Sequence, residues 1–314
     1  MKSKSSSTDR IYTLNSYVQK HFGEKLYKLS LNGGMTCPNR DGSLDTRGCI
    51  FCSRGGSGDF AASSTLSITE QIENAKTLIC DKFHGSHYIA YFQAFTNTYA
   101  PVNFLKQIFE EAINHPDISV LSIATRPDCL GDDVIALLSD LNRIKPVWIE
   151  LGLQTVKPET ATYIRRGYEL DCYESAVRKL HAAGIQVITH VILGLPGETE
   201  EDMLNTIRYL NFVKTDGVKL QLLHVLKDTD LADDYKNQKF FTLTFDEYID
   251  VVIKCIEYLS PEIVIHRLTG DGPRNLLIAP TWSLNKKHVL NTINHELAVR
   301  GSYQGKEFDT SHGY

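Results

Sequence analysis

The chain has 314 residues, of which 42% are hydrophobic, and it carries a formal net charge of −5 at pH 7 with a pI near 6.1. This length allows one large domain with an appendage, or two domains. The negative net charge of the chain as a whole does not favour nucleic-acid binding. Local basic patches are still possible, and the candidates are Arg165-Arg166 and Lys286-Lys287-His288. No apolar run is as long as a membrane span, and the start of the chain lacks the apolar part of a secretion signal, so we expect a cytoplasmic protein without a membrane partner.

Three cysteines near the start of the chain form the most specific motif: Cys37, Cys49 and Cys52, spaced C-x11-C-x2-C. Glycine and polar turn residues surround them, which favours a loop (the cysteine loop, residues 37–52) that can gather three thiolates. Thiolates select zinc or iron–sulfur clusters, and a structural zinc ion needs a fourth ligand, whereas the next cysteine is Cys80. The pattern therefore favours a metal centre with an open coordination position, which Phe51 could shield from water. Seven cysteines without a secretion signal indicate a reducing compartment.

After the cysteine loop, helix-periodic segments alternate with strand-like apolar segments. Ser67-Ile-Thr-Glu70 and Thr244-Phe-Asp-Glu247 are capping boxes, each of which starts a helix. In chain order we expect a strand at 26–31, a helix at 68–83, a strand at 88–93, a helix at 104–113, a strand at 118–124, a helix at 133–141, a strand at 147–153, a helix at 173–183, a strand at 185–193, a helix at 200–213, a strand at 218–225, a helix at 244–259 and a strand at 263–266.

This alternation predicts an α/β fold with a parallel sheet. About six βα units precede residue 230, which predicts a partial (β/α)6-type parallel barrel over 16–230. We expect 1–15 to be a disordered lead and 231–314 an α/β extension that closes the barrel. Functional side chains of such barrels collect at the C-terminal ends of the strands. The polar residues at this edge are Gln93 with Thr96 and Asn97, Thr125 with Arg126, Glu150 with Gln154, and His224 with Lys227.

With the cysteine loop leading this βα series, the chain resembles the radical S-adenosylmethionine (SAM) superfamily over about residues 10–305. The cysteine spacing departs from the commonest C-x3-C-x2-C and is similar to the longer loop of the branch related to the elongator catalytic subunit. Three further segments follow the order of that branch: Glu150-Leu-Gly-Leu-Gln154-Thr, Arg166-Gly-Tyr168 and His190-Val-Ile-Leu-Gly-Leu-Pro-Gly197-Glu198. Tyr168 stands where that branch has His, so it is assigned no role.

Within the branch, the chain most resembles the bacterial MnmL-type family that modifies the wobble uridine of tRNA. The segments that carry this resemblance are Cys37-Pro-Asn-Arg-Asp-Gly, Gly48-Cys-Ile-Phe-Cys-Ser, Ser57-Gly-Asp-Phe and His266-Arg-Leu-Thr-Gly-Asp271. The resemblance implies that a 5-carboxymethylaminomethyl group on tRNA is trimmed to aminomethyl. It also implies an electron donor such as flavodoxin or ferredoxin.

The resemblance further implies roles for individual residues. The three cysteines would hold a [4Fe–4S] cluster that cleaves SAM to a 5′-deoxyadenosyl radical. The implied SAM contacts are Gln93, Thr96 and Asn97 at the methionine amino group, Glu150 and Gln154 at the ribose, and backbone around Leu195 at the adenine. No catalytic residue is identified, but Arg126, Lys227 or Arg267 could bind the carboxylate of the substrate.

Two alternatives remain open on the sequence. A radical SAM enzyme could act on a small molecule or a protein in place of RNA. A zinc-stabilised binding module could use the cysteine loop for structure only. Cys80, Cys129, Cys172 and Cys255 show no pair spacing, which argues against a second cluster. The sequence leads to no prediction of the oligomeric state.

Overall fold

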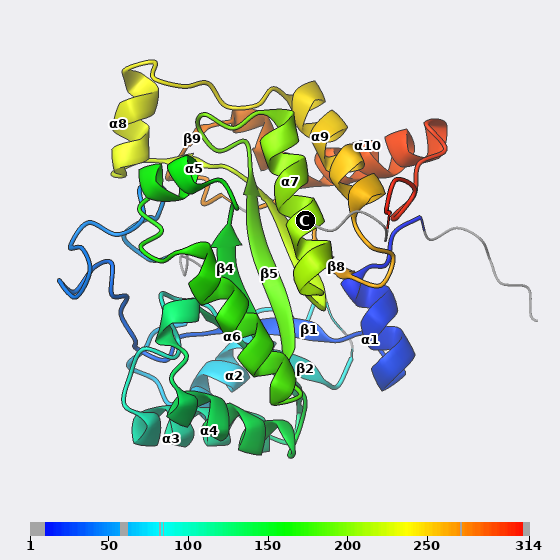
Figure 1. The fold of residues 1–314 in the computed structure, drawn as a ribbon. Coiled ribbons are helices and arrows are strands. Elements are labelled where there is room, and N and C mark those ends of the chain that lie inside the picture. Colours follow the sequence, from blue (N-terminus) through cyan, green and yellow to red (C-terminus); the bar gives the residue numbers. More distant parts are fainter. Residues whose placement is uncertain (1–9, 57–61, 82, 84, 271, 310–314) are drawn as a thin grey trace, which may run out of the picture.

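A computed structural model describes residues 10–309 of the chain, except 57–61, 82, 84 and 271. Its main feature is one curled sheet of seven parallel strands, in the order β1-β2-β3-β4-β5-β6-β8 (Figure 1). The strands are β1 Tyr27–Leu31, β2 Tyr88–Phe92, β3 Ile118–Thr125, β4 Val147–Gln154, β5 Gln186–Leu193, β6 Gly217–Leu222 and β8 Val264–Arg267. In the described part of the chain, β1 and β8 end the sheet without pairing, so the predicted α/β partial barrel is confirmed, with β8 as a seventh strand.

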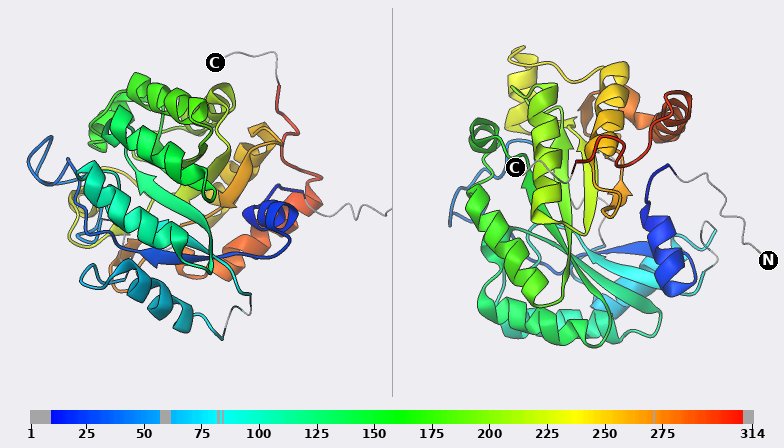
Figure 2. Two further views of the ribbon diagram at one scale, coloured as in Figure 1. Left: turned by 90° about the horizontal axis from the view of Figure 1, so that it is seen from below. Right: turned by 45° about the vertical axis from the view of Figure 1, so that its right-hand side comes forward.

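Helices cover the convex face of this sheet, as the two further views show (Figure 2). Helix α2 packs on β1, α3 on β3, α4 on β4, and both α6 and α7 pack on β5. The helices are α1 Leu14–Phe22, α2 Ile68–Thr77, α3 Val102–Asn114, α4 Asp132–Asn142, α5 Pro158–Tyr163, α6 Leu170–Ala182, α7 Glu200–Val213, α8 Asp230–Lys236, α9 Phe245–Tyr258 and α10 Lys286–Val299.

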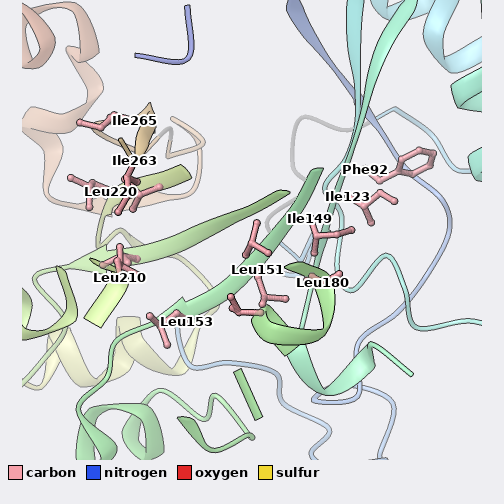
Figure 3. Close-up of a cluster of buried hydrophobic side chains, with 14 of the residues drawn as sticks. Phe92, Ile123, Ile149, Leu151, Leu153, Leu180, Leu210, Leu220, Ile263 and Ile265 are labelled. Atoms are coloured by element: carbon pink, nitrogen blue, oxygen red, sulfur yellow. The ribbon is translucent and has the colours of Figure 1, made fainter. Parts of the chain in front are cut away.

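Local sequence explains where several helices begin. Ser67 accepts a hydrogen bond from the backbone N–H of Glu70, whose carboxylate accepts one from the backbone N–H of Ser67, and Thr244 and Glu247 do the same at α9. Between helices and sheet lies the main core, and Figure 3 shows some of its side chains, which come from β2, β3, β4, β6, β8 and helices α6 and α7. Strands such as β2 and β4 bury apolar side chains at successive positions and therefore on both faces, which is why they were evident as apolar runs.

A second, smaller apolar cluster closes the inside of the barrel at the amino-terminal ends of the strands. Val18 of α1 packs there with side chains from four strands and from the chain before β1: Leu26, Ile89, Val120, Trp148 and Ile188. The Tyr17 hydroxyl of α1 also donates to the Gln186 side chain, 3.0 Å away. Helix α1 therefore forms the base of the barrel interior, opposite the end that the C-termini of the strands form.

This placement of α1 corrects the predicted lead of residues 1–15. The Thr13 side chain caps α1, Thr13 forms a bridge with Ile265, and the backbone N–H of Tyr12 donates to the side chain of Gln304 at 2.8 Å. Residues 10–15 are thus part of the fold, because long-range pairing and a helix cap hold a segment whose composition alone predicts disorder. The rest of the domain division stays a prediction, and the Ser57–Phe60 segment and Asp271 lie outside the described residues.

The predicted strand 218–225 is wrong in its second half. Strand β6 ends at Leu222, and β7 (Val225–Leu226) pairs antiparallel with β9 (Leu277–Ala279) in a separate ribbon. An apolar run indicates that a segment is buried, but it does not indicate which strand the segment pairs with. The sequence of this run therefore could not show that its last residues belong to a different sheet. Helix α10 was not predicted, although Val289, Ile293 and Leu297 bury one face at a spacing of four residues.

Candidate active site

A cavity of about 290 Å³ opens at the C-terminal ends of the strands and reaches into the barrel. The structure brings most of the predicted site residues to its wall: Cys37, Cys49, Phe51, Cys52, Gln93, Thr96, Arg126, Glu150, Gln154 and Arg267. Asn97, Leu195 and Lys227 are not part of this wall. The cavity thus joins the cysteine loop, which follows β1, to side chains of the barrel interior.

Short backbone contacts shape the cysteine loop into a compact turn. The backbone N–H of Arg40 donates to the Cys37 carbonyl at 2.8 Å, and that of Cys52 donates to the Cys49 carbonyl at 3.0 Å. The Arg40 guanidinium crosses the loop and donates to the Ser53 carbonyl at 2.6 Å. Gly48 is required where this guanidinium passes, because its φ is +79° and an added Cβ would lie 2.8 Å from Arg40 Nε.

The surroundings of Cys49 favour its neutral thiol unless a cation binds. The residue is partly exposed, but burial of its sulfur raises the pKa of the Cys49 thiol to about 12, and the neighbouring Cys52 and Cys37 act in the same direction. Asn39 opposes this rise by donating from Nδ2 to Cys49 Sγ at 3.4 Å. Thiolates crowded in this way need a cation to remain ionised, and a bound metal centre supplies one.

The spacing of the sulfurs distinguishes a cluster from a single zinc ion. Zinc holds each sulfur at about 2.3 Å, which places tetrahedral ligands about 3.8 Å apart. Among the described residues, only Glu73, His115 and Asp117 bring three possible metal ligands within 4.8 Å of one another, and those carboxylates pair with Lys76. The three cysteine sulfurs do not form such a group, so at least one pair of them is more than 4.8 Å apart, a spacing that suits a cluster in which each thiolate binds a different iron.

Gln154 ends β4 at the cavity with two unusual features. Its φ is +67°, a conformation that costs free energy in a non-glycine residue, and its Oε1 is buried without a hydrogen-bond partner. A buried amide oxygen of this kind is normally satisfied, so a bound ligand is a natural donor for it. Asn97 also has a buried side-chain oxygen, Oδ1, without a hydrogen-bond partner, but its Nδ2 donates to the Ala124 carbonyl at 2.9 Å and the residue does not line the cavity.

Arg126 lines the cavity, but its donors are engaged within the protein. It forms a two-bond ion pair with Asp128, at 2.9 and 2.6 Å, and donates to the Arg166 carbonyl at 3.0 Å. Its guanidinium also lies 5.0 Å from the centre of the Tyr168 ring, which faces Arg166 as well. Arg126 therefore serves mainly to hold this wall of the cavity.

Tyr168 and Arg166 were not assigned roles from the sequence, yet both fix the end of β4. The Tyr168 hydroxyl donates to the Gly152 carbonyl at 2.7 Å, and Arg166 donates to the Thr155 carbonyl at 2.7 Å. The candidate basic patch at Arg165-Arg166 is not present, because Arg166 is buried and Arg165 pairs with Asp230 at 2.6 Å.

Leu195 and Lys227 do not line the cavity themselves. Leu195 is buried in an apolar cluster with Ile192 and Leu223, both of which line the cavity. Lys227 is exposed, and its Nζ donates to the Asn275 carbonyl at 2.9 Å. The sequence order placed both residues after strands, but it could not show that the turn before β7 leads Lys227 away from the barrel interior.

Deep in the cavity, Glu150 is the centre of a buried charged network. Its carboxylate accepts from Lys28 at 2.6 Å, from Ser122 at 2.9 Å and from His190 at 2.7 Å, and it also pairs closely with Lys219. Burial alone would raise the pKa of Glu150, but Lys219 and Lys28 outweigh burial and hold this pKa well below its usual value. The carboxylate is therefore fully occupied by protein donors, which was not foreseen when Glu150 was expected to face the ribose.

Fold and site together form an α/β half-barrel with three cysteines in the wall of the cavity at the C-terminal ends of its strands. The model of the Radical SAM superfamily matches residues 46–210, and that of the Radical_SAM C-terminal domain matches residues 215–298. The chain belongs to the radical SAM superfamily. It is thus a radical SAM enzyme, which uses a [4Fe–4S] cluster and SAM and needs a reductant, and this excludes the zinc-stabilised binding module.

Known proteins extend this similarity along most of the chain. The chain is 46% identical to YtqA of Bacillus subtilis (strain 168), over 97% of this chain and 94% of that protein. It is 25% identical to a tRNA uridine(34) acetyltransferase of Methanocaldococcus jannaschii, over 55% of this chain and 32% of that protein. Among solved structures, the archaeal Methanocaldococcus infernus Elp3 with its N-terminus deleted shares the fold, with a TM-score of 0.68 at 15% identity, over 89% of this chain and 64% of that chain. None of the helices in the described ranges is long and apolar enough to span a membrane.

Proposed function

We propose that this enzyme modifies the wobble uridine of tRNA, trimming a 5-carboxymethylaminomethyl group to aminomethyl, with a cluster bound by Cys37, Cys49 and Cys52. The observation that carries the proposal is one cavity whose wall contains the three cysteines together with cationic side chains. Such a cavity suits a substrate group that ends in an anion. A similar protein is named for its action on tRNA uridine 34, which supports the choice of nucleoside.

The residues of the chain have distinct tasks in this proposal. When bound, the cluster and SAM supply the one-electron chemistry that removes a hydrogen atom from the substrate. Asn39 donates to Cys49 and adjusts the charge on that sulfur, while Phe51 and Phe95 line the cavity and exclude water beside the cysteines. The buried Gln154 Oε1 is available to accept a hydrogen bond from SAM or from the substrate.

A nucleoside comparison tests the tRNA substrate. tRNA nucleosides from a strain without this enzyme are compared with those of the parent strain by mass spectrometry. We expect 5-carboxymethylaminomethyl uridines to accumulate and aminomethyl-derived uridines to disappear. Complementation with the enzyme should restore the parent pattern, whereas a variant with Cys49→Ala should not. Unchanged wobble uridines would contradict the proposal.

Purified enzyme separates tRNA from the other substrate classes. Reconstituted protein, SAM and a reductant are incubated with either modified tRNA or the free modified nucleoside, and the aminomethyl product is measured. Conversion of tRNA alone indicates a polynucleotide substrate. Equal conversion of the free nucleoside would instead favour a small-molecule enzyme.

A further inference from the structure

Asn39 is a buried residue of the cysteine loop whose side-chain amide contacts a cysteine sulfur. Its Nδ2 donates to Cys49 Sγ at 3.4 Å, to the Arg165 carbonyl at 2.8 Å and to the Arg166 carbonyl at 3.4 Å. Only 2% of the residue is exposed. The amide of Asn39 therefore links the sulfur of one predicted cluster ligand to backbone that lies outside the cysteine loop.

The surroundings of this amide fix its orientation. The Nδ2 side faces one sulfur and two carbonyl oxygens, all of which accept hydrogen bonds. If the amide were turned over, its oxygen would face these three acceptors with no donor between them. On its other side, Oδ1 lies against Gly167, where an added Cβ would come within 2.8 Å of this oxygen. Asn39 thus presents an N–H group, and not a carbonyl oxygen, to Cys49.

Backbone contacts hold both partners of this hydrogen bond. The backbone N–H of Gly48 donates to the Asn39 carbonyl at 2.7 Å, and that of Ile50 donates to the Ile164 carbonyl at 3.2 Å. These two bonds flank Cys49 in the sequence and tie it to Asn39 and to the end of α5. Because the protein already holds the donor and the sulfur in place, little further side-chain entropy is lost in keeping them together.

A hydrogen bond to a ligand sulfur changes how readily an iron–sulfur cluster is reduced. One electron leaves the external reductant and enters the cluster, so the cluster with its thiolates becomes more negative by one charge. An N–H group that points at a sulfur stabilises the more negative state more than the less negative one. Hydrogen bonds to the sulfurs are accordingly among the features that set the reduction potential of such clusters.

Resting on the ligand assignment in the proposed function, we propose that Asn39 is a positioning residue that raises the reduction potential of the cluster through its hydrogen bond to the sulfur of Cys49. The residue acts through Cys49 and does not itself contact SAM or the substrate. Its effect is to make the electron transfer that precedes SAM cleavage easier for a given reductant.

A redox titration of the reconstituted cluster, followed by EPR, tests this role. Asn39→Leu has a similar size but lacks the donor. We expect the ratio of reduced to oxidised cluster at a fixed solution potential to fall about tenfold, which corresponds to about 59 mV for one electron. Asn211→Leu is the matched control, because Asn211 Nδ2 also donates to a backbone carbonyl, that of Tyr258 at 2.8 Å, but lies outside the cavity wall. The control should keep the potential of the wild type.

Pulsed EPR of the wild type keeps the test independent of how well a variant folds. The protein is isotope-labelled at the side-chain amide nitrogen of asparagine, and its cluster is reduced. We expect a magnetic coupling between the reduced cluster and a labelled nitrogen. The coupling should disappear in Asn39→Asp, which nearly keeps the shape of the side chain, and should persist in Asn211→Leu.

The choice of reductant separates an effect on the potential from a structural defect. With a reductant whose potential is close to that of the cluster, Asn39→Leu should cleave SAM more slowly than the wild type, by up to about tenfold. A much stronger reductant should recover the rate. A loss of rate that is the same with both reductants would indicate a structural defect and would count against the proposal.

Three results would overturn the role of Asn39. The first is an equal potential in Asn39→Leu and the wild type, and the second is a wild-type spectrum without a coupling to asparagine nitrogen. The third is an equal fall of the potential in Asn211→Leu, because a general loosening of the fold would then explain the shift.

These measurements use no tRNA, so they distinguish failure of this role from failure of the proposed function. If wobble uridines are unchanged in the deletion strain while the shift in Asn39→Leu persists, the tRNA proposal fails and the role of Asn39 stands. If the wild type modifies tRNA but its potential does not depend on Asn39, this role fails alone. If the wild type takes up no cluster, the ligand assignment fails together with the role of Asn39.

Discussion

Glu198 should make the stability of this enzyme depend on pH in an unusual direction. Burial raises the pKa of Glu198 from its ordinary 4.5 to about 7, although the Thr155 hydroxyl donates to it and favours the charged form. Between these two values the native protein holds a proton that the unfolded chain has released. The free energy of unfolding must therefore fall as the pH rises through this window.

The size of the effect follows from the two pKa values. A difference between 4.5 and about 7 corresponds to about 3 kcal/mol, at about 1.36 kcal/mol for each pKa unit. Glu198→Gln keeps the shape of a protonated carboxyl group but cannot ionise. The variant should lose this part of the pH dependence. Its free energy of unfolding, relative to that of the wild type, should therefore be higher at pH 8 than at pH 5.

Chemical denaturation at pH 5 and pH 8, followed by circular dichroism, measures this difference. Other titrating groups are common to both proteins and cancel when the two pH profiles are subtracted. Glu159→Gln, at an exposed position on α5, is the matched control and should follow the wild type. The reasoning is refuted if Glu198→Gln and the wild type change in stability by the same amount between the two pH values.

Three other perturbations have outcomes that the structure defines. Replacing any cysteine of the cysteine loop by Ala should abolish the visible absorption of the reconstituted cluster while far-ultraviolet circular dichroism stays native; retained absorption in all three variants would contradict the ligand assignment. Glu150→Gln should lower the free energy of unfolding by about 3–5 kcal/mol, because it leaves buried lysines without their carboxylate, and a loss below about 1 kcal/mol in urea titration would show that the network is not coupled in this way. Gly48→Ala should reduce cluster content per protein far more than Gly42→Ala, since both have positive φ but only the first would place a Cβ against Arg40; equal iron content in the two variants would count against this explanation.

Much of the fold could be predicted because its signals are local. Strands such as β2 are apolar at every position, and the helices α2 and α9 begin at capping boxes that can be identified within four residues. Strands β7 and β9 contain two and three residues, and their pairing joins segments about fifty residues apart in the sequence. No local pattern specifies such a contact, which is why the predicted strand 218–225 extended too far.

The same difference between local signals and long-range contacts applies to the residues of the site. The cysteines are close in sequence and define their loop by spacing, so they could be identified directly. Lys219 and Lys28 have no distinguishing neighbours in the sequence, and only strand register brings them to Glu150. One signal was still available, because Lys219 lies between the apolar residues Val218 and Leu220 of a mostly buried strand, and a buried lysine needs a partner.

The position of α1 has a consequence for the order of events in turnover. Because this helix packs across the amino-terminal ends of the strands, we expect molecules to reach the cavity from the opposite rim, where the cysteines lie. A small molecule bound at the inner residues of the cavity would then be covered by a larger substrate bound at that rim. We therefore expect the small molecule to bind before the larger substrate and to be released after it.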